Sequence, residues 1–230
     1  DSITFAMPNV FEAVFGFYAS SKLGLKCHMV HPVTPVKQME KHMQATKSNT
    51  LVILDTFFDH YKALLNHKDI KFFLVNPMNL FGFFMSSIYK LINRKKRAHI
   101  TFNQRVRKFS SLYLDQALEA VDTNPKTTAV YLHSGGTSGK PKTIELSHYA
   151  INYLASQTPY VMDVGDFNQK HMLAVLPMFH GFGLCMGIHG MLICGGVNTL
   201  MPKFSAEEAV KLIGKNQINR MKMKKTKFYN

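Results

Sequence analysis

The sequence predicts an α/β protein in which layered, parallel-rich sheets are flanked by helices. The first observation is the order strand, helix, strand, helix, strand along residues 1–54, which is typical of parallel α/β folds. The second is the stretch 171–202, which contains no Lys, Arg, Asp or Glu and is divided by glycines into lengths typical of buried strands and one buried helix. A chain of 230 residues with 46% hydrophobic residues can bury a substantial core around such sheets.

The N-terminal segment begins with the apolar run 3–7, which predicts a buried strand ending at Pro8. A helix is expected next, because apolar residues recur at helical spacing at Phe11, Val14, Phe15, Tyr18 and Leu23. Gly24 stands where a helix C-cap belongs. The segment 27–30 then predicts a second strand.

A second helix is predicted to begin at Thr34-Pro35, since threonine can cap a helix and proline suits the first turn. This helix extends to about Ala45 and is followed by a third strand at 51–54. The alternation of strands and helices in this region is the main support for a parallel sheet.

Residues 72–108 form an insertion that is first apolar and then basic. Its cleanest apolar run, 83–92, is too short to span a bilayer, and the cationic cluster 94–97 follows directly. This composition fits an interfacial segment that places aromatic side chains in lipid and cations on anionic headgroups. An insertion packed on the domain with a solvated basic rim is the alternative, and both interpretations stay open.

A further helix is predicted near the end of the insertion, because Thr101 and Gln104 have the spacing of a capping box. One apolar helical stripe would consist of Phe102, Val106, Phe109 and Tyr113. We expect this stripe to face the core.

A glycine-rich segment, 134–142, directly follows the predicted strand 128–132. Glycines let the backbone turn its amides toward one point and so form an anion-binding nest. Thr137 and Ser138 can donate to phosphate oxygens, and Lys142 adds a full charge. The chain is then extended at 144–146 before another predicted helix.

The Walker A pattern does not fit this glycine-rich segment. Ser134 stands where that pattern needs its first glycine, and Lys140 is followed by Pro141, which has no hydroxyl for magnesium. The dinucleotide-binding pattern of spaced glycines fails as well. From composition alone, a Gly/Ser turn without a ligand remains open.

The C-terminal part predicts strands at 172–176 and 197–200, with a helix at about 184–194 between them. Ser205 and Glu208 form a capping box that opens a helix toward Ile213. The patterning ends at a basic tail, 219–230, for which a solvated, disordered tail and an out-of-frame end both stay open.

The net charge of +14 comes from two segments, because eight basic residues fall between Lys90 and Lys108 and six between Lys215 and Lys227, with no acidic residue in either. Such clustering, without a recognised motif, argues against a nucleic-acid partner. Three cysteines without metal-ligand or disulfide spacing favour a reducing cytoplasm.

The segment 134–142 resembles the phosphate-loop signature of the adenylate-forming (AMP-binding) superfamily. Residues 176–183, Leu-Pro-Met-Phe-His-Gly-Phe-Gly, resemble the downstream P-x-F-H motif of the same superfamily. Residues 6–9 and the helix that ends at 22–24 resemble its N-terminal region. The resemblance covers about 1–218 and is strongest to acyl-CoA synthetases of the long-chain fatty-acid–CoA ligase type, with the insertion 72–108 as a feature that some of these ligases share.

The resemblance implies the site residues one by one. It makes the following residues the ATP-binding contacts: Ser134, Gly135, Gly136, Thr137, Ser138, Gly139 and Lys142. It also implies that Thr137 helps to hold Mg²⁺ and that Lys142 and His180 are catalytic, Lys142 as a positive anchor and His180 near the carboxylate. A hydrogen-bonded structural histidine is the other interpretation of His180. Thr143 departs from the family, which often has glycine at this position.

The function that the resemblance implies is ATP-dependent activation of a carboxylic acid, most simply a fatty acid, to an acyl-adenylate and then a coenzyme A thioester. ATP, Mg²⁺ and coenzyme A are the expected cofactors. The family's Tyr-Gly-x-[ST]-Glu motif, ribose-binding Asp and C-terminal Lys are not found in this sequence, so we expect an N-terminal portion that is inactive alone. The alternative function is a non-catalytic module that binds anionic membranes.

Overall fold

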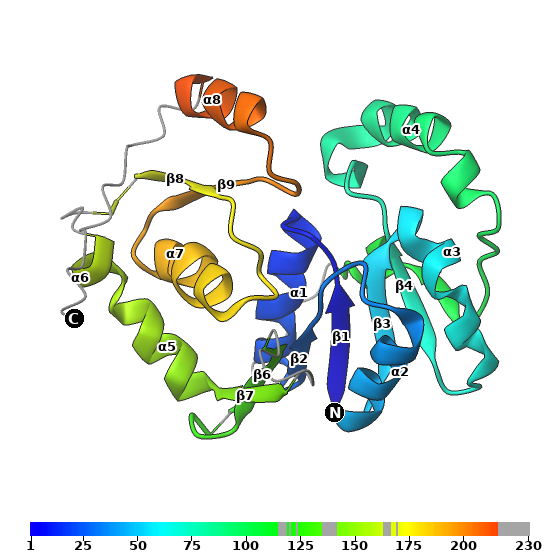
Figure 1. The fold of residues 1–230 in the computed structure, drawn as a ribbon, viewed down its shortest axis with the longest axis horizontal. Coiled ribbons are helices and arrows are strands. Elements are labelled where there is room, and N and C mark those ends of the chain that lie inside the picture. The colour runs from blue at the N-terminus through cyan, green and yellow to red at the C-terminus, as the bar shows by residue number, and fades with distance from the viewer. Residues whose placement is uncertain are drawn as a thin grey trace.

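The computed structural model describes residues 1–114, 119, 121–122, 124–134, 142–162, 167–168 and 170–215. Within these residues a large sheet is flanked by helices, and a separate pair of strands lies beside helices of the C-terminal part (Figure 1). The large sheet comprises β1 Ser2–Ala6, β2 Lys26–Met29, β3 Ser48–Leu54, β4 Lys71–Val75, β5 Val106–Lys108, β6 Thr128–His133 and β7 Thr143–Ser147. The pair comprises β8 His171–Ala174 and β9 Val197–Leu200.

The strand order in the large sheet is β5-β4-β3-β1-β2-β6-β7, and neighbouring strands are parallel except for the antiparallel β6 and β7. The helices are α1 Phe11–Lys22, α2 Val36–Ala45, α3 Phe58–Tyr61, α4 Gly82–Ile92, α5 His148–Ser156, α6 Thr158–Met162, α7 Met191–Ile193 and α8 Ala206–Lys215. A π-helical segment, Gly183–Gly190, continues directly into α7. The predicted fold class is therefore confirmed.

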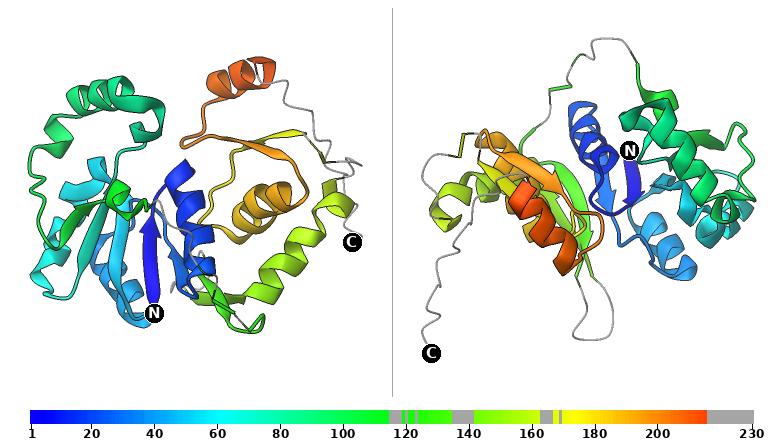
Figure 2. Two further views of the ribbon diagram at one scale, coloured as in Figure 1. Left: turned by 180° about the vertical axis from the view of Figure 1, so that it is seen from behind. Right: turned by 90° about the horizontal axis from the view of Figure 1, so that it is seen from above.

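The large sheet buries both faces, as parallel sheets require. Side chains alternate along each strand, so that Phe5 belongs to a core cluster with residues of α1 and the π-helical segment. Ala6 belongs to a second cluster with Met39 and Met43 of α2. Figure 2 shows the resulting layers from two further directions.

Helix α1 forms where the sequence predicts it, and Gly24 adopts the left-handed conformation, φ 67°, that suits a residue after a helix C-terminus. The buried face differs from the apolar stripe, because Phe11, Phe15 and Leu23 are exposed. Gly16 sets this orientation, since a Cβ there would lie 2.3 Å from the Phe5 ring. A close approach between helix and sheet therefore overrides the simple count of apolar residues.

The start of α2 differs in detail from the prediction. Pro35 is the N-cap and no side chain caps the helix. The Thr34 hydroxyl instead donates to the carbonyl of His31 at 2.8 Å. The strands predicted at 3–7, 27–30, 51–54 and 128–132 all form, with ends shifted by one to three residues.

The helix predicted across 101–113 is wrong. Asn103 Oδ1 accepts hydrogen bonds from the backbone amides of Arg105 and Val106 at 2.8 and 2.9 Å, a local turn that competes with helix formation. Val106 then pairs with Phe72 as strand β5 joins the sheet. Of the expected stripe, Phe102 and Tyr113 are exposed, while Val106 and Phe109 are buried.

In the C-terminal part, the helix expected at about 184–194 and the strands on either side of it form. Ser147 and Ser205 accept hydrogen bonds at the starts of α5 and α8, from the amides of Ala150 and Glu208. The basic tail 219–230 lies outside the described residues, so the boundary at 218 stays a prediction. No described helix has the length and apolar character needed to cross a bilayer.

Candidate active site

The glycine-rich segment joins β6 to β7, and the structure describes both of its ends. The amide of Ser134 donates to the carbonyl of Lys142 at 3.1 Å, and the amide of Lys142 donates to Ser134 Oγ at 3.3 Å. The first of these bonds continues the β6–β7 ladder by one pair beyond His133 and Thr143, and the second adds a side-chain contact. The first and last residues of the segment are thereby held together at the ends of β6 and β7.

A cavity of about 200 Å³, which we call the site cavity, lies against the first residue of this loop. Its lining includes His31, His42, His133, Ser134, Phe179 and His180. His180 and Ser134 are therefore brought to one cavity although 46 positions separate them in the sequence. The exposed imidazole of His180 can reach a ligand in this cavity.

Asn9, in the turn between β1 and α1, holds the segment that carries His180. Its Nδ2 donates to the carbonyls of Ala174 and Leu176 at 2.9 and 3.0 Å, and its Oδ1 accepts from the amide of Met178 at 2.9 Å. Asn9 is only 2% exposed, so these bonds are shielded from water. The first loop of the large sheet thus fixes the path of residues 174–178.

Gly183 allows the helix after His180 to begin close to that segment. A Cβ at Gly183 would lie 2.2 Å from the carbonyl oxygen of Pro177, a distance that no side chain tolerates. The amide of Leu184 donates to the carbonyl of His180 at 2.9 Å, which starts the helix immediately. His180 therefore sits at the junction of a clamped loop and a buried helix.

Three histidines contact one another behind the loop. His28 Nε2 and His133 Nε2 are 2.7 Å apart, and the rings of His42 and His133 lie 3.6 Å apart between centroids. His28 is fully buried in β2, whereas His133 is the last residue of β6 and directly precedes Ser134. The parallel pairing of β2 with β6 brings these side chains together.

Hydrogen bonding fixes the tautomers of this group. The hydroxyls of Thr4 and Thr46 both lie near His28 Nδ1, and each donates elsewhere, to Ser48 Oγ and to the His42 carbonyl. His28 Nδ1 must then carry the proton, so His28 Nε2 accepts from the Nε2–H of His133. His133 Nδ1 is left as a buried acceptor without a partner in the described part of the chain.

Burial favours the neutral forms of His28, His31 and His133. Burial lowers the pKa of His28 to about 2, with His133 and His42 as further causes. Burial and the neighbouring His42 lower the pKa of His133 to about 4. Burial and then His180 lower the pKa of His31. At neutral pH these three side chains can form hydrogen bonds but carry no positive charge. Among the described residues, the lysine at the end of the loop, Lys142, is the cation closest to the loop in sequence.

The described residues do not form a metal centre. No group of three His, Cys, Asp or Glu side chains among them is arranged to hold a metal ion. Mg²⁺ prefers oxygen ligands, and the described lining of the site cavity contains no carboxylate. This part of the chain therefore does not fit Mg²⁺ by itself.

The structure locates three of the sequence-predicted site residues. Ser134 and His180 line the site cavity, and Lys142 is exposed at the end of the loop, bonded through its backbone to Ser134. The others, Gly135, Gly136, Thr137, Ser138 and Gly139, lie outside the described residues. Sequence reasoning missed Asn9 and the histidine group, because only the strand register and the folded path of residues 174–178 reveal them.

The sequence matches the family model of the AMP-binding enzyme over residues 1–223. The long-chain-fatty-acid–CoA ligase of Bacillus subtilis (strain 168) is 24% identical over 227 residues, which cover 94% of this chain and 40% of that ligase. The chain thus spans about two-fifths of the length of this relative.

Solved structures with a similar fold include the following two. One is o-succinylbenzoate CoA synthetase (MenE) from Bacillus subtilis in complex with the acyl-adenylate intermediate OSB-AMP, with a TM-score of 0.66 and 17% identity over 95% of this chain and 48% of that chain. The other is ATP-bound MatB from Rhodopseudomonas palustris, with a TM-score of 0.67 and 18% identity over 94% of this chain and 38% of that chain.

Proposed function

The chain belongs to the AMP-binding enzyme family, and we propose that this protein uses ATP to activate a carboxylic acid and then transfers the acyl group to coenzyme A. The carboxylate attacks the α-phosphorus of ATP, the bond to pyrophosphate breaks, and an acyl-adenylate forms. The thiol of coenzyme A then attacks the acyl carbon and releases AMP. The observation that carries this proposal is the convergence of Ser134 and His180 on one cavity.

In this proposal the loop 134–142 holds the β- and γ-phosphates and steadies the leaving pyrophosphate. Backbone amides and the hydroxyls of Thr137 and Ser138 donate to phosphate oxygens, and Lys142 neutralises charge. Such reactions are catalysed mainly by positioning and by stabilising charge as it develops. The two hydrogen bonds between Ser134 and Lys142 support this role, because they fix both ends of the loop before a nucleotide binds.

We assign His180 to contact with the carboxylate or acyl group. Its exposed ring lies at the site cavity beside Phe179, and the centroids of these two rings are 4.9 Å apart. Asn9 and Gly183 act as positioning residues, because they fix the backbone on either side of the P-x-F-H motif. Mg²⁺, when bound to ATP, would neutralise phosphate charge, and we propose Thr137 as the residue of this chain that reaches it.

A fatty acid is the proposed substrate. The relation to the Bacillus subtilis long-chain-fatty-acid–CoA ligase and the apolar insertion 72–108 support this choice. The similar o-succinylbenzoate CoA synthetase fold keeps an aromatic acid as the second candidate. We also propose a cytoplasmic protein, since all three cysteines are free, and one that makes peripheral membrane contact to reach an apolar substrate.

Thermal unfolding in the presence of acyl-sulfamoyl-adenosine analogues tests this proposal. These compounds mimic the acyl-adenylate, and ligands that bind the folded chain raise Tm. We expect the hexadecanoyl analogue to raise Tm more than the benzoyl and acetyl analogues. A larger shift with the benzoyl analogue would contradict the fatty-acid assignment, and the absence of a shift with all three would contradict an adenylate site in this chain.

The chain spans about two-fifths of its relatives, and we propose that it does not complete adenylation alone. Acid-dependent exchange of pyrophosphate into ATP by the purified 230-residue protein would overturn this part of the proposal.

A further inference from the structure

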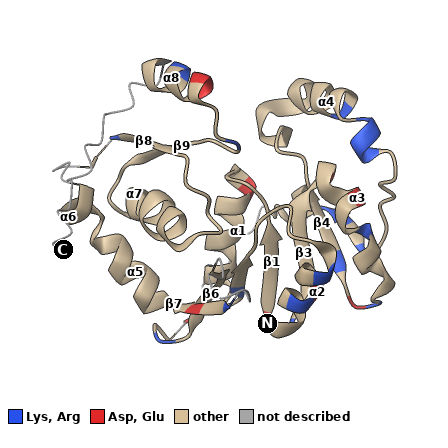
Figure 3. Ribbon diagram, viewed as in Figure 1, with Lys and Arg blue, Asp and Glu red and all other residues tan. Residues whose placement is uncertain are grey.

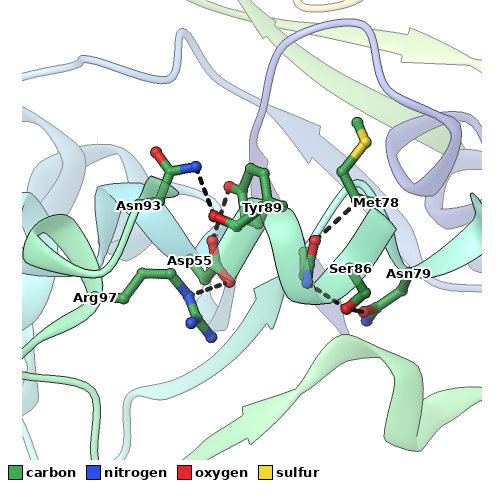
Figure 4. A network of polar contacts seen from close by, with 8 residues as sticks. Asp55, Met78, Asn79, Ser86, Tyr89, Asn93 and Arg97 are labelled. Carbon is green, nitrogen blue, oxygen red and sulfur yellow. Dashed lines mark hydrogen bonds and ion pairs between the residues drawn. The ribbon is translucent and has the colours of Figure 1, made fainter. Parts of the chain in front are cut away.

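Helix α4 is attached to the protein by polar side chains. Ser86 is 4% exposed; its hydroxyl accepts from Asn76 Nδ2 at 2.9 Å and donates to Asn79 Oδ1 at 2.8 Å. Asn76 Oδ1 in turn accepts from the amide of Met78 at 3.0 Å. Figure 4 shows Met78, Asn79 and Ser86 within this network of polar contacts. Ser86 is the only buried residue of α4.

A second anchor lies one turn further along α4. The Tyr89 hydroxyl donates to Asp55 Oδ1 at 2.9 Å, and Arg97 Nε donates to Asp55 Oδ2 at 2.8 Å (Figure 4). Asp55 is 2% exposed, so both partners bind a carboxylate that is shielded from solvent. Asn93 Nδ2 donates to the carbonyl of Tyr89 at 3.0 Å and closes the end of the helix. The orientation of α4 is therefore firmly fixed.

Large apolar side chains elsewhere on α4 are exposed to solvent. Phe83, in the first turn, is 87% exposed, Phe84 74%, Leu91 68% and Ile92 75%. At about 100° per residue, Phe84 and Leu91 lie about 160° and about 140° from Ser86 around the helix axis, so these two side chains face away from the buried serine. An ordinary surface helix has the reverse arrangement, with its apolar stripe toward the core. An apolar surface held outward by buried polar bonds indicates an interaction site.

Cations border this apolar face. Arg94, Lys95 and Lys96 are exposed in the turn that follows α4, where Figure 3 shows basic residues. None of these three forms an ion pair in the described part of the chain, and no acidic residue occurs between 70 and 114. We define the α4 surface as Phe83, Phe84, Leu91, Ile92, Arg94, Lys95 and Lys96.

We propose that the α4 surface binds bilayers that contain anionic phospholipid, with the helix lying along the membrane plane. Aromatic and aliphatic side chains enter the boundary between headgroups and acyl chains, and the three cations contact the phosphate layer. The inference rests on the proposed membrane contact and identifies the face that makes it. A second copy of the chain is a poorer occupant, because pairing two α4 surfaces would oppose cations of like charge.

Flotation of the full chain with lipid vesicles tests this inference. Wild type should float with vesicles that mix phosphatidylcholine and phosphatidylglycerol and should float far less with phosphatidylcholine alone. Replacing Arg94, Lys95 and Lys96 by Gln should weaken binding to the anionic vesicles about 100-fold, since each cation near such a surface contributes roughly fivefold. Replacing Phe83 and Phe84 by Gln should weaken binding by about tenfold or more for each side chain.

Matched controls lie on other parts of the protein. Phe204→Gln removes an aromatic side chain that is 66% exposed, and joint Gln substitution of the exposed Lys37, Lys41 and Lys68 removes three cations elsewhere. Both controls should float like wild type. Circular dichroism should show every variant folded, because the substituted side chains are exposed.

Two results would overturn the inference. If the α4 variants float as well as wild type while anionic vesicles still bind the chain, another segment makes the contact. If wild type does not float with anionic vesicles, the proposed membrane contact fails as well. Neither result bears on acid activation, because the analogue-dependent change in Tm is measured without lipid.

Discussion

Asn9 does more for the candidate site than its place in the sequence suggests. It does not line the site cavity, yet it makes three hydrogen bonds to the backbone of residues 174–178. The sequence places Asn9 in a family-like N-terminal segment but gives no sign of its partners, which lie 165 to 169 positions away. Long-range hydrogen bonds of this kind depend on the folded path of a loop, which local patterns do not encode.

The histidine group is the second residue-scale feature that sequence reasoning did not find. His28, His42 and His133 have no motif spacing, and they meet because β2 pairs with β6 and helix α2 places His42 against His133. Their neutral state follows from burial and mutual repulsion, not from any property of the sequence near them. The segment 134–142, in contrast, stands out in the sequence by its glycines and its place after a predicted strand, and its role stays a prediction.

Folding stability should fall as the pH is lowered through the range in which unfolded histidine titrates. His28 has a pKa of about 2 in the folded protein, whereas an unfolded histidine titrates at about 6.5, so below that pH the unfolded chain binds the extra proton. As the pH is lowered from 7 to 5, this single residue should decrease the free energy of unfolding by about 2 kcal/mol. Above pH 7 it should have no effect on stability.

Urea unfolding of wild type and His28→Gln at a series of pH values measures this effect. The variant lacks the titrating group, so its stability should depend less steeply on pH below 6.5, whatever its absolute stability. An equal dependence in both proteins would show that His28 is not the group held neutral by folding.

At the scale of elements, the sequence predicts most strands and helices correctly. Strands are clear where short apolar runs are followed by glycine or proline, as at β1 and β9, and helix starts are clear where Ser147 or Ser205 supplies a cap. The prediction fails at 101–113, where Asn103 forms a local turn and Val106 joins the sheet. The spacing of a capping box is local in sequence, so it could not show that these residues pair with the edge strand β4 of the large sheet.

Two glycines in the helix after His180 should respond in opposite ways to alanine. At Gly183 a Cβ would meet the Pro177 carbonyl at 2.2 Å, so Gly183→Ala should destabilise the protein by about 1–3 kcal/mol. At Gly187 the nearest atom would be 3.7 Å away, so Gly187→Ala should stabilise it by up to about 1 kcal/mol through helix propensity. Urea unfolding of both variants gives the comparison, and equal effects would refute the close approach at Gly183.

At the scale of the whole molecule, the candidate site is assembled from segments far apart in the chain. The loop comes from the β6–β7 hairpin, His180 from the segment after β8, and the clamp from the turn after β1 (Figure 1). The α4 surface belongs to the insertion, separate in sequence from all three. We infer that the protein divides nucleotide binding and membrane contact between different parts of one fold.

The central claim is that the loop 134–142 and His180 belong to one site, in which the loop binds the phosphates of ATP and His180 lies beside the place of the carboxylate. It is tested most directly by titrating the isotope-labelled chain with millimolar ATP and following its amide and imidazole signals by NMR. The account predicts shifts concentrated at 134–142 and His180, with roughly tenfold weaker binding for Lys142→Gln and unchanged binding for Lys126→Gln, an exposed lysine before β6. Shifts located elsewhere, or equal weakening by both substitutions, would contradict it.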